Sequence, residues 1–172
     1  MIITQIDVTG LVRARVYDTA DQADTNPSAV LRVELADELA TGTGADQANQ
    51  VYYDAQTIAL STRVTYDLAG TLVDVFGDTI TFARVKTIMI YNASTAGVLD
   101  VGGGTDGGGT NAFVNWISAA AEEVEVRPGG FLLLHAPDAT AYPVTAATAD
   151  ILGLNEIAAA ACPVQVAFVG VV

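Results

Sequence analysis

The sequence predicts an all-β protein, specifically an antiparallel β-sandwich or jelly roll with at most short helical turns. Three observations carry this prediction. β-Branched and aromatic residues recur in short runs, apolar and polar residues alternate within these runs, and Gly, Pro, Asn and Asp separate them. Strands spaced by turn residues, with little helical periodicity, are typical of sandwiches and jelly rolls. The 172 residues fit one domain, residues 1–172.

The N-terminal region is predicted to form strands that reach neighbouring molecules. Ile2–Val8 and Leu11–Tyr17 are rich in β-branched residues, and Gly10 between them indicates a turn or bulge. A polar loop follows at Asp18–Ser28, and the next segment, Ala29–Leu35, alternates apolar and charged residues as a half-exposed strand does. Because strand-like termini are ordered only when something ties them down, residues 1–38 are expected to act as an arm that contacts neighbours.

The rest of the chain is predicted to be mostly strand, with Leu72–Phe76 as a short connection or single helical turn. Glu123–Arg127 and Phe131–His135 flank Pro128-Gly129-Gly130 and are expected to pair as a β-hairpin. Two Ala-rich stretches, Ser118–Glu123 and Ile157–Ala161, are the candidate helices. The other expected strands are Gln50–Leu60 (with a break near Asp54), Val64–Leu68, Thr79–Tyr91, Val98–Val101, Ile151–Asn155 and Val164–Val172.

Composition excludes several classes of protein. The net charge is −13 and the pI is about 4.1, which argues against nucleic-acid binding, since that needs a basic surface. Hydrophobic residues make up 51% and charged residues 16%, the opposite of a disordered chain. No apolar run is long enough to span a bilayer, and the first residues show no secretory signal. So few charges favour a protein whose surface is partly covered by other subunits.

Neither the single histidine nor the single cysteine predicts catalysis. The sequence contains neither a GxSxG nor an HExxH motif, so a structural role of His135 at a strand end is favoured over a role in a catalytic triad. Cys162 lies among alanine, proline and valine and is expected to be a buried, inert thiol. One cysteine rules out an internal disulfide, and one Cys with one His cannot complete a zinc site. The chain is therefore predicted not to be an enzyme.

Several polar segments have a functional and a plainer interpretation. The glycine-rich loop Val101–Asn111, around Asp106, could cradle an anion but lacks the lysine of a phosphate-binding loop, so a turn at a contact surface is favoured. Asp18, Asp21 and Asp24 are candidate ligands for Ca²⁺. The run of Glu122, Glu123 and Glu125 could supply the carboxylate pair of a glycosidase. Asn92-Ala93-Ser94 fits a glycosylation sequon. Their spacing or context supports none of these roles, so no catalytic, cofactor-binding or metal-binding residue is assigned.

Motifs in a fixed order give a further indication. TGTGADQA begins at Thr41, DLAG at Asp67, TFARVK at Thr81 and APDATAY at Ala136. This order resembles a family of small structural proteins of tailed phages and prophages, over roughly Leu39 to Leu154. The chain departs from the family pattern by the inserted segment Thr105–Gly109 and by its ending, AAAACPVQVAFVGVV.

The resemblance implies a virion protein that is made in the host cytoplasm and has no catalytic residues, and from the composition we expect no nucleic-acid or membrane partner. We expect a capsid decoration (cement) protein on the outer head surface, which binds the major capsid protein and copies of itself, as a trimer. A tail or neck structural or adsorption component is an alternative. Another, from a different class, is a carbohydrate-binding β-sandwich with Trp116, Tyr142 and Tyr91 as stacking platforms.

Overall fold

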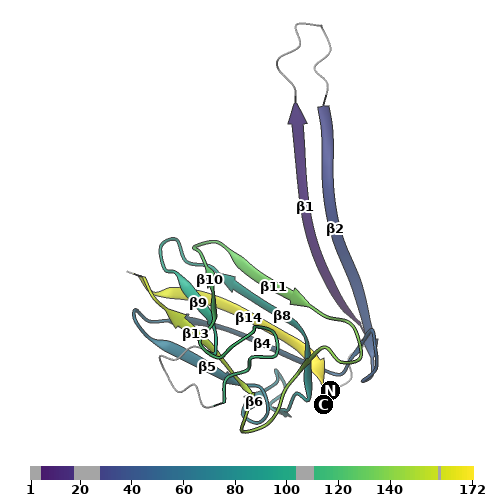
Figure 1. Ribbon diagram of the computed structural model, residues 1–172, viewed down its shortest axis with the longest axis vertical. Helices are drawn as coiled ribbons and strands as arrows, with labels where there is room; N and C mark the ends of the chain where they lie inside the picture. The colour runs from purple at the N-terminus through teal and green to yellow at the C-terminus, as the bar shows by residue number, and fades with distance from the viewer. Residues whose placement is uncertain (1–4, 18–27, 104–110, 159) are drawn as a thin grey trace, which may run out of the picture.

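The chain folds as a β-sandwich body from which one long β-hairpin projects (Figure 1). The structure is a computed structural model and describes residues 5–17, 28–103, 111–158 and 160–172. Within those ranges the secondary structure is all strand and turn, with no helix, so the all-β prediction is confirmed. None of the described residues forms a helix of the length and apolar character that a bilayer crossing requires.

Two antiparallel sheets make up the body. One has the order β11-β8-β14-β4, and the short β12 also pairs with β8; the other has the order β10-β9-β13-β5. The strands of the first sheet, here called the front sheet, are β4 (Gln50–Ile58), β8 (Arg84–Asn92), β11 (Phe131–His135), β12 (Tyr142–Pro143) and β14 (Cys162–Val171). Those of the second, the back sheet, are β5 (Arg63–Asp67), β9 (Leu99–Gly102), β10 (Glu123–Val126) and β13 (Ile151–Glu156). A small ribbon of β6 (Leu72–Val73) and β7 (Thr79–Ile80) lies at one end.

The core lies between the two sheets and follows the strand period of two. Along β14, Val164, Val166 and Phe168 are buried while Pro163 and Gln165 are exposed. The Phe168 ring stacks on Tyr52 with ring centres 5.7 Å apart and meets Tyr66 edge-on at 5.4 Å. Aromatic pairs in these geometries add to the free energy gained from burial alone. The front sheet therefore has one face in the core and one face directed away from it.

The hairpin consists of β1 (Ile6–Tyr17) and β2 (Ser28–Thr41), which pair with each other from Ile6↔Leu39 to Tyr17↔Ser28. Near its base β2 also pairs in parallel with the short β3 (Gln47–Ala48). In Figure 1 the two strands rise well clear of the sandwich. We call this hairpin the arm, and residues 10–17 and 28–35 its distal part. Twelve residues of extended strand make β1 roughly 40 Å long.

The structure corrects the sequence analysis at the N-terminus. Gly10 is neither a turn nor a bulge, because β1 runs through it in continuous register, opposite Leu35. Residues 1–4 and 18–27, which include Asp18, Asp21 and Asp24, lie outside the described residues.

The expected hairpin of Glu123–Arg127 and Phe131–His135 is wrong. β10 pairs with β9 in the back sheet, whereas β11 pairs with β8 in the front sheet. The turn between them crosses from one sheet to the other, with Gly129 at a φ of 72°. Asn92 holds this crossing, since its N–H donates to the Gly130 carbonyl at 2.9 Å and its carbonyl accepts from Gly129 at 3.0 Å.

Other expected elements differ in smaller ways. Residues 118–122 form turns, and the described part of 157–161 has no helix, because six or fewer residues gain too few hydrogen bonds to nucleate one. Thr79–Tyr91 is divided into β7 and β8, while β4 runs unbroken past Asp54. Leu72–Phe76 contains β6 and the start of the turn into β7.

Candidate assembly surface

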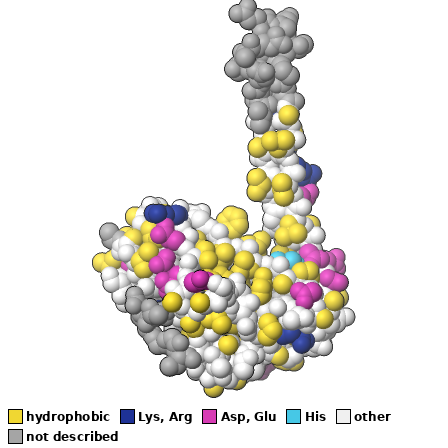
Figure 2. Space-filling model, in the orientation of Figure 1, with side chains coloured by type: hydrophobic (Ala, Val, Ile, Leu, Met, Phe, Trp, Pro, Cys, Tyr) yellow, Lys and Arg dark blue, Asp and Glu magenta, His cyan; other side chains and the backbone are white. Residues whose placement is uncertain are grey.

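The register of the arm separates its side chains into an apolar and a polar face. Residues directly opposite each other in an antiparallel pair lie on the same face. One face thus carries Gly10, Val12, Ala14, Leu31, Val33 and Leu35, and we call it the apolar face of the arm. Val12 is 69% exposed and Val33 is 72% exposed. Figure 2 shows hydrophobic side chains in a stripe up the arm.

Charges are unevenly distributed along the polar face. Near the base, Asp7 lies opposite Glu38, and farther out Arg13 lies opposite Arg32. Like charges directly opposite on a sheet repel each other. Arg32 forms an ion pair with Glu34 on its own strand, which offsets part of this repulsion. The polar face is therefore acidic near the body and basic in its distal part.

Apolar contacts fix the base of the arm to the body. Leu39 is fully buried and packs with Ala48 and Val169, and Ile6 and Val51 pack against this small cluster. Val8, at 5% exposed, is the last arm residue on this side to be buried. The hydrophobic burial of the arm thus ends near Val8, and Val12, four residues farther along β1, is largely in solvent.

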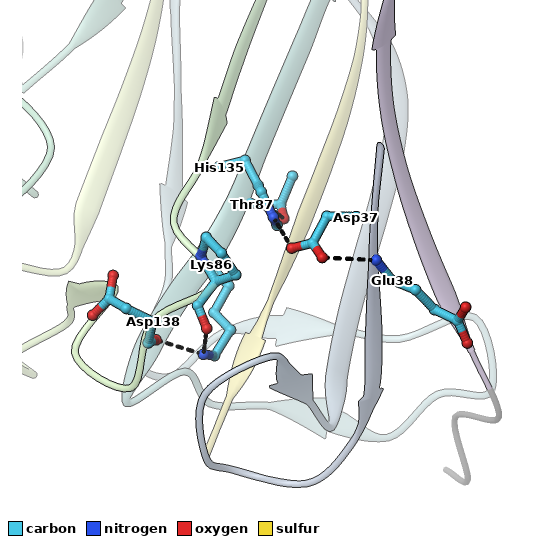
Figure 3. Close-up of polar contacts among 7 residues, drawn as sticks. Asp37, Glu38, Lys86, Thr87, His135 and Asp138 are labelled. Atoms are coloured by element: carbon cyan, nitrogen blue, oxygen red, sulfur yellow. Dashed lines mark hydrogen bonds and ion pairs between the residues drawn. The ribbon is translucent and has the colours of Figure 1, made fainter. Parts of the chain in front are cut away.

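A polar clamp reinforces this junction (Figure 3). His135 Nε2 lies 2.7 Å from Asp37 Oδ2, and His135 Nδ1 lies 2.9 Å from Thr87 Oγ1. An Nε2–H that donates to Asp37 leaves Nδ1 to accept from the threonine hydroxyl. The hydrogen bond from His135 lowers the pKa of Asp37 below its ordinary value of 3.8, and the Glu38 N–H, which donates to Oδ1 at 3.0 Å, acts in the same direction.

Lys86 supports the same corner from inside. The side chain is fully buried, and its Nζ donates to the carbonyls of Pro137 at 2.9 Å and Asp138 at 2.6 Å (Figure 3). The Pro137 carbonyl also accepts the Asp46 N–H at 2.8 Å. Burial lowers the pKa of the Lys86 ammonium, and the Asp138 carboxylate opposes this shift. The Pro137 carbonyl therefore joins the loop after β11 to the loop between β2 and β3, and Lys86 holds this carbonyl in place.

The clamp should depend on pH through Asp37. Because its pKa is lower in the folded chain, its stabilising effect is complete above pH 3.8 and is lost as the pH falls through the folded value. Asp37→Asn should lower the free energy of unfolding at neutral pH by about 0.5–1 kcal/mol, since the carboxylate still contacts solvent. Thermal unfolding of both proteins from pH 7 to pH 3 measures this. The difference in Tm should shrink as the pH falls below 3.8, and a difference that stays constant would contradict the role of Asp37.

An apolar hollow lies between the arm and the outward face of the front sheet. Its volume is about 440 Å³, and we call it the notch. The arm contributes Ile6, Asp7, Val8, Thr9, Gly10 and Leu11, and the sheet contributes Thr87, Met89, Phe131, Leu133, Ala167 and Val169. Most of these side chains are apolar. Figure 2 shows hydrophobic side chains on the body continuing toward the arm at this junction.

The residues singled out in the sequence do not form a common site. His135 belongs to the clamp, whose partner Asp37 is 98 positions away and was not foreseen. Cys162 is fully buried, its Sγ donates to Asn92 Oδ1 at 3.0 Å, and burial raises its pKa. Among the described residues no group of His, Cys, Asp or Glu is arranged to hold a metal ion. Residues 104–110 of the glycine-rich loop, with Asp106, lie outside the described residues.

The aromatic and acidic candidates are also dispersed. Trp116 and Tyr142 pack against the core, whereas Tyr91 lies on the outward face of the front sheet, next to Phe131 and Gln165. The three rings thus do not build one stacking platform. Glu122 bonds to the Ser118 hydroxyl and Glu125 pairs with Arg127, while Glu123 begins β10. Asn92, the sequon residue, is fully buried, and its side chain bridges four partners.

The chain was compared with protein-family models, with curated proteins and with solved structures, and none of the three comparisons found a match.

Proposed function

We propose that the chain is a structural protein of a tailed-phage virion, and that it acts as a capsid decoration (cement) protein on the outer surface of the head. The observation that carries the proposal is the arm, whose distal apolar face has no partner within the described chain. A two-stranded ribbon is marginally stable in water, and exposed edge strands invite pairing with another chain. Such an element is suited to contact a neighbouring subunit.

Two further features support this proposal. The order of motifs from TGTGADQA to APDATAY resembles phage structural proteins, and the net charge of −13 suits a surface that does not touch packaged DNA. The partners would be the major capsid protein and copies of this chain, as a trimer.

The proposed mechanism is mechanical and uses no catalytic residue. Burying four side chains such as Val12, Leu31, Val33 and Leu35 across a subunit boundary contributes on the order of 6 kcal/mol, before the entropy cost of association. Internal pressure pushes the subunits of the shell apart, and each bound copy of this chain holds neighbouring subunits together. Many copies on one head therefore multiply the contribution of a single contact.

Heads that lack the protein provide the test. Adding the purified chain should raise the temperature at which these heads release their DNA, and labelled chain should be found over the head surface by electron microscopy. Binding to tails or necks alone would favour the alternative location. Tight binding to a glycan array without binding to heads would overturn the proposal in favour of a carbohydrate-binding sandwich.

A further inference from the structure

We propose that the apolar face of the arm docks into the notch of a second copy of this chain, so that copies assemble by exchanging arms. The inference rests on the proposed function in treating the arm as an assembly surface. It goes further by naming the partner of the arm and the site that receives it.

Each copy carries both halves of the contact, the apolar face of the arm and the notch. The notch continues into an exposed apolar row across the front sheet, formed by the cross-strand neighbours Leu133, Met89, Ala167 and Tyr53. Met89 is 43% exposed, Tyr53 is 53% exposed, and Phe131 at the rim is 65% exposed. The distal arm presents a matching apolar ribbon. Such large exposed apolar areas on a soluble domain mark interaction sites.

Gly10 keeps the notch open. It lies on the apolar face between Val8 and Val12, and a Cβ at this position would sit 3.7 Å from Leu133 Cδ2, an ordinary contact distance. A valine here would therefore fit the backbone and occupy the hollow. Glycine weakens a strand interior, so its place beside an apolar hollow fits a site that another chain approaches closely.

Charge complementarity favours a second copy over an unrelated partner. The acidic pair Asp7 and Glu38 lies at the base of the arm on its polar face, opposite the face that borders the notch, and a shallow hollow there is lined by Asp7, Thr9, Ala36, Asp37 and Glu38. Arg13 and Arg32 lie on the distal arm. When the arms of two copies lie edge to edge and antiparallel, with the apolar face of each distal arm over the notch of the other copy, the arginines of one copy come level with the carboxylates of the other on the shared polar face. The repulsion between Arg13 and Arg32 is thereby relieved.

The geometry allows two closed assemblies. Reciprocal exchange between two copies closes a dimer, and head-to-tail exchange closes a ring such as a trimer. In both, every arm and every notch is occupied, so the apolar face of the arm and the notch are both covered.

The association state of the purified chain, without capsids, tests the inference. Sedimentation velocity should show a multimer. Val33→Asp and Gly10→Val should each weaken association at least about tenfold, the first by charging the apolar face and the second by filling the notch. The matched control is Val75→Asp, because Val75 is 76% exposed, close to the 72% of Val33, but lies in the turn after β6. It should leave association unchanged.

Misfolding is separated from loss of docking by the same variants. Gly10→Val should raise the Tm of the chain slightly while it weakens association, which an unfolded variant cannot do. Mixing a Val33→Cys chain with a Phe131→Cys chain under oxidising conditions should give a mixed disulfide, while Val75→Cys with Phe131→Cys should not. Native Cys162 is fully buried and does not compete.

The outcomes distinguish this inference from the proposed function. A monomer at every concentration, or a multimer that survives both Val33→Asp and Gly10→Val, overturns arm exchange, even if the chain binds heads. A multimer that depends on the arm but does not bind heads supports arm exchange and contradicts the decoration function.

Discussion

A chain whose distal arm is removed should fold like the intact protein and lose its binding to phage heads. Replacing residues 12–33 by a two-residue Asn-Gly turn joins Leu11 to Glu34, which are opposite each other in the hairpin. Of the excised residues that the structure describes, none belongs to either buried cluster, whereas Val8, Leu39 and the clamp are kept. Head binding should therefore fall below detection while the Tm changes by only a few degrees.

Co-sedimentation of the shortened chain with heads measures the binding, and thermal unfolding measures the stability. A full-length control with Val12→Thr and Val33→Thr separates the effect of length from that of apolar surface, because threonine keeps the strand preference and removes the apolar contact. This control should also bind weakly. Normal head binding by the shortened chain would contradict the role of the arm in the proposed function.

Asn92→Leu should cost about 3–5 kcal/mol of the free energy of unfolding. The Asn92 amide lies fully buried at the end of β8 and donates to the carbonyls of Gly97 and Val126, each at 2.9 Å. Its Oδ1 accepts from the Ser94 N–H at 3.0 Å. Leucine has a similar volume but no polar atoms, so these groups lose a partner in the interior, where water cannot replace it.

Urea denaturation of the wild-type and Asn92→Leu proteins measures this cost. Ser94→Ala is the matched control, because the Ser94 hydroxyl donates to the same Gly97 carbonyl at 2.7 Å and its loss leaves the Asn92 bonds in place. The control should lose only about 1 kcal/mol. A loss below that value for Asn92→Leu would mean that the network does not hold the two sheets together.

The strands of this protein were predictable because their burial follows a period of two. β14 alternates from Cys162 to Phe168 and β4 from Tyr52 to Ile58, and the sequence indicated both strands. Strand partners were not predictable in the same way. The turn Pro128-Gly129-Gly130 is compatible with a hairpin or with a crossing between sheets, and contacts of Asn92, far earlier in the chain, select the crossing.

The candidate assembly surface was predictable in part. Alternation in Ala29–Leu35 already indicated a strand with one apolar face. The alternation of apolar and polar residues indicates that such a face prefers burial. It does not indicate whether the residues that cover the face belong to the same chain. The clamp could not be foreseen, since Asp37 and His135 are distant in sequence and the fold alone brings them together.

The repeating geometry of the arm makes its reach adjustable. Adding two residues to each strand would extend the hairpin by roughly 7 Å and keep every apolar side chain on the same side, whereas adding one would turn the stripe over. Because the added residues would not enter the sandwich, lineages or designers could change the spacing between subunits by such paired insertions without rebuilding the core.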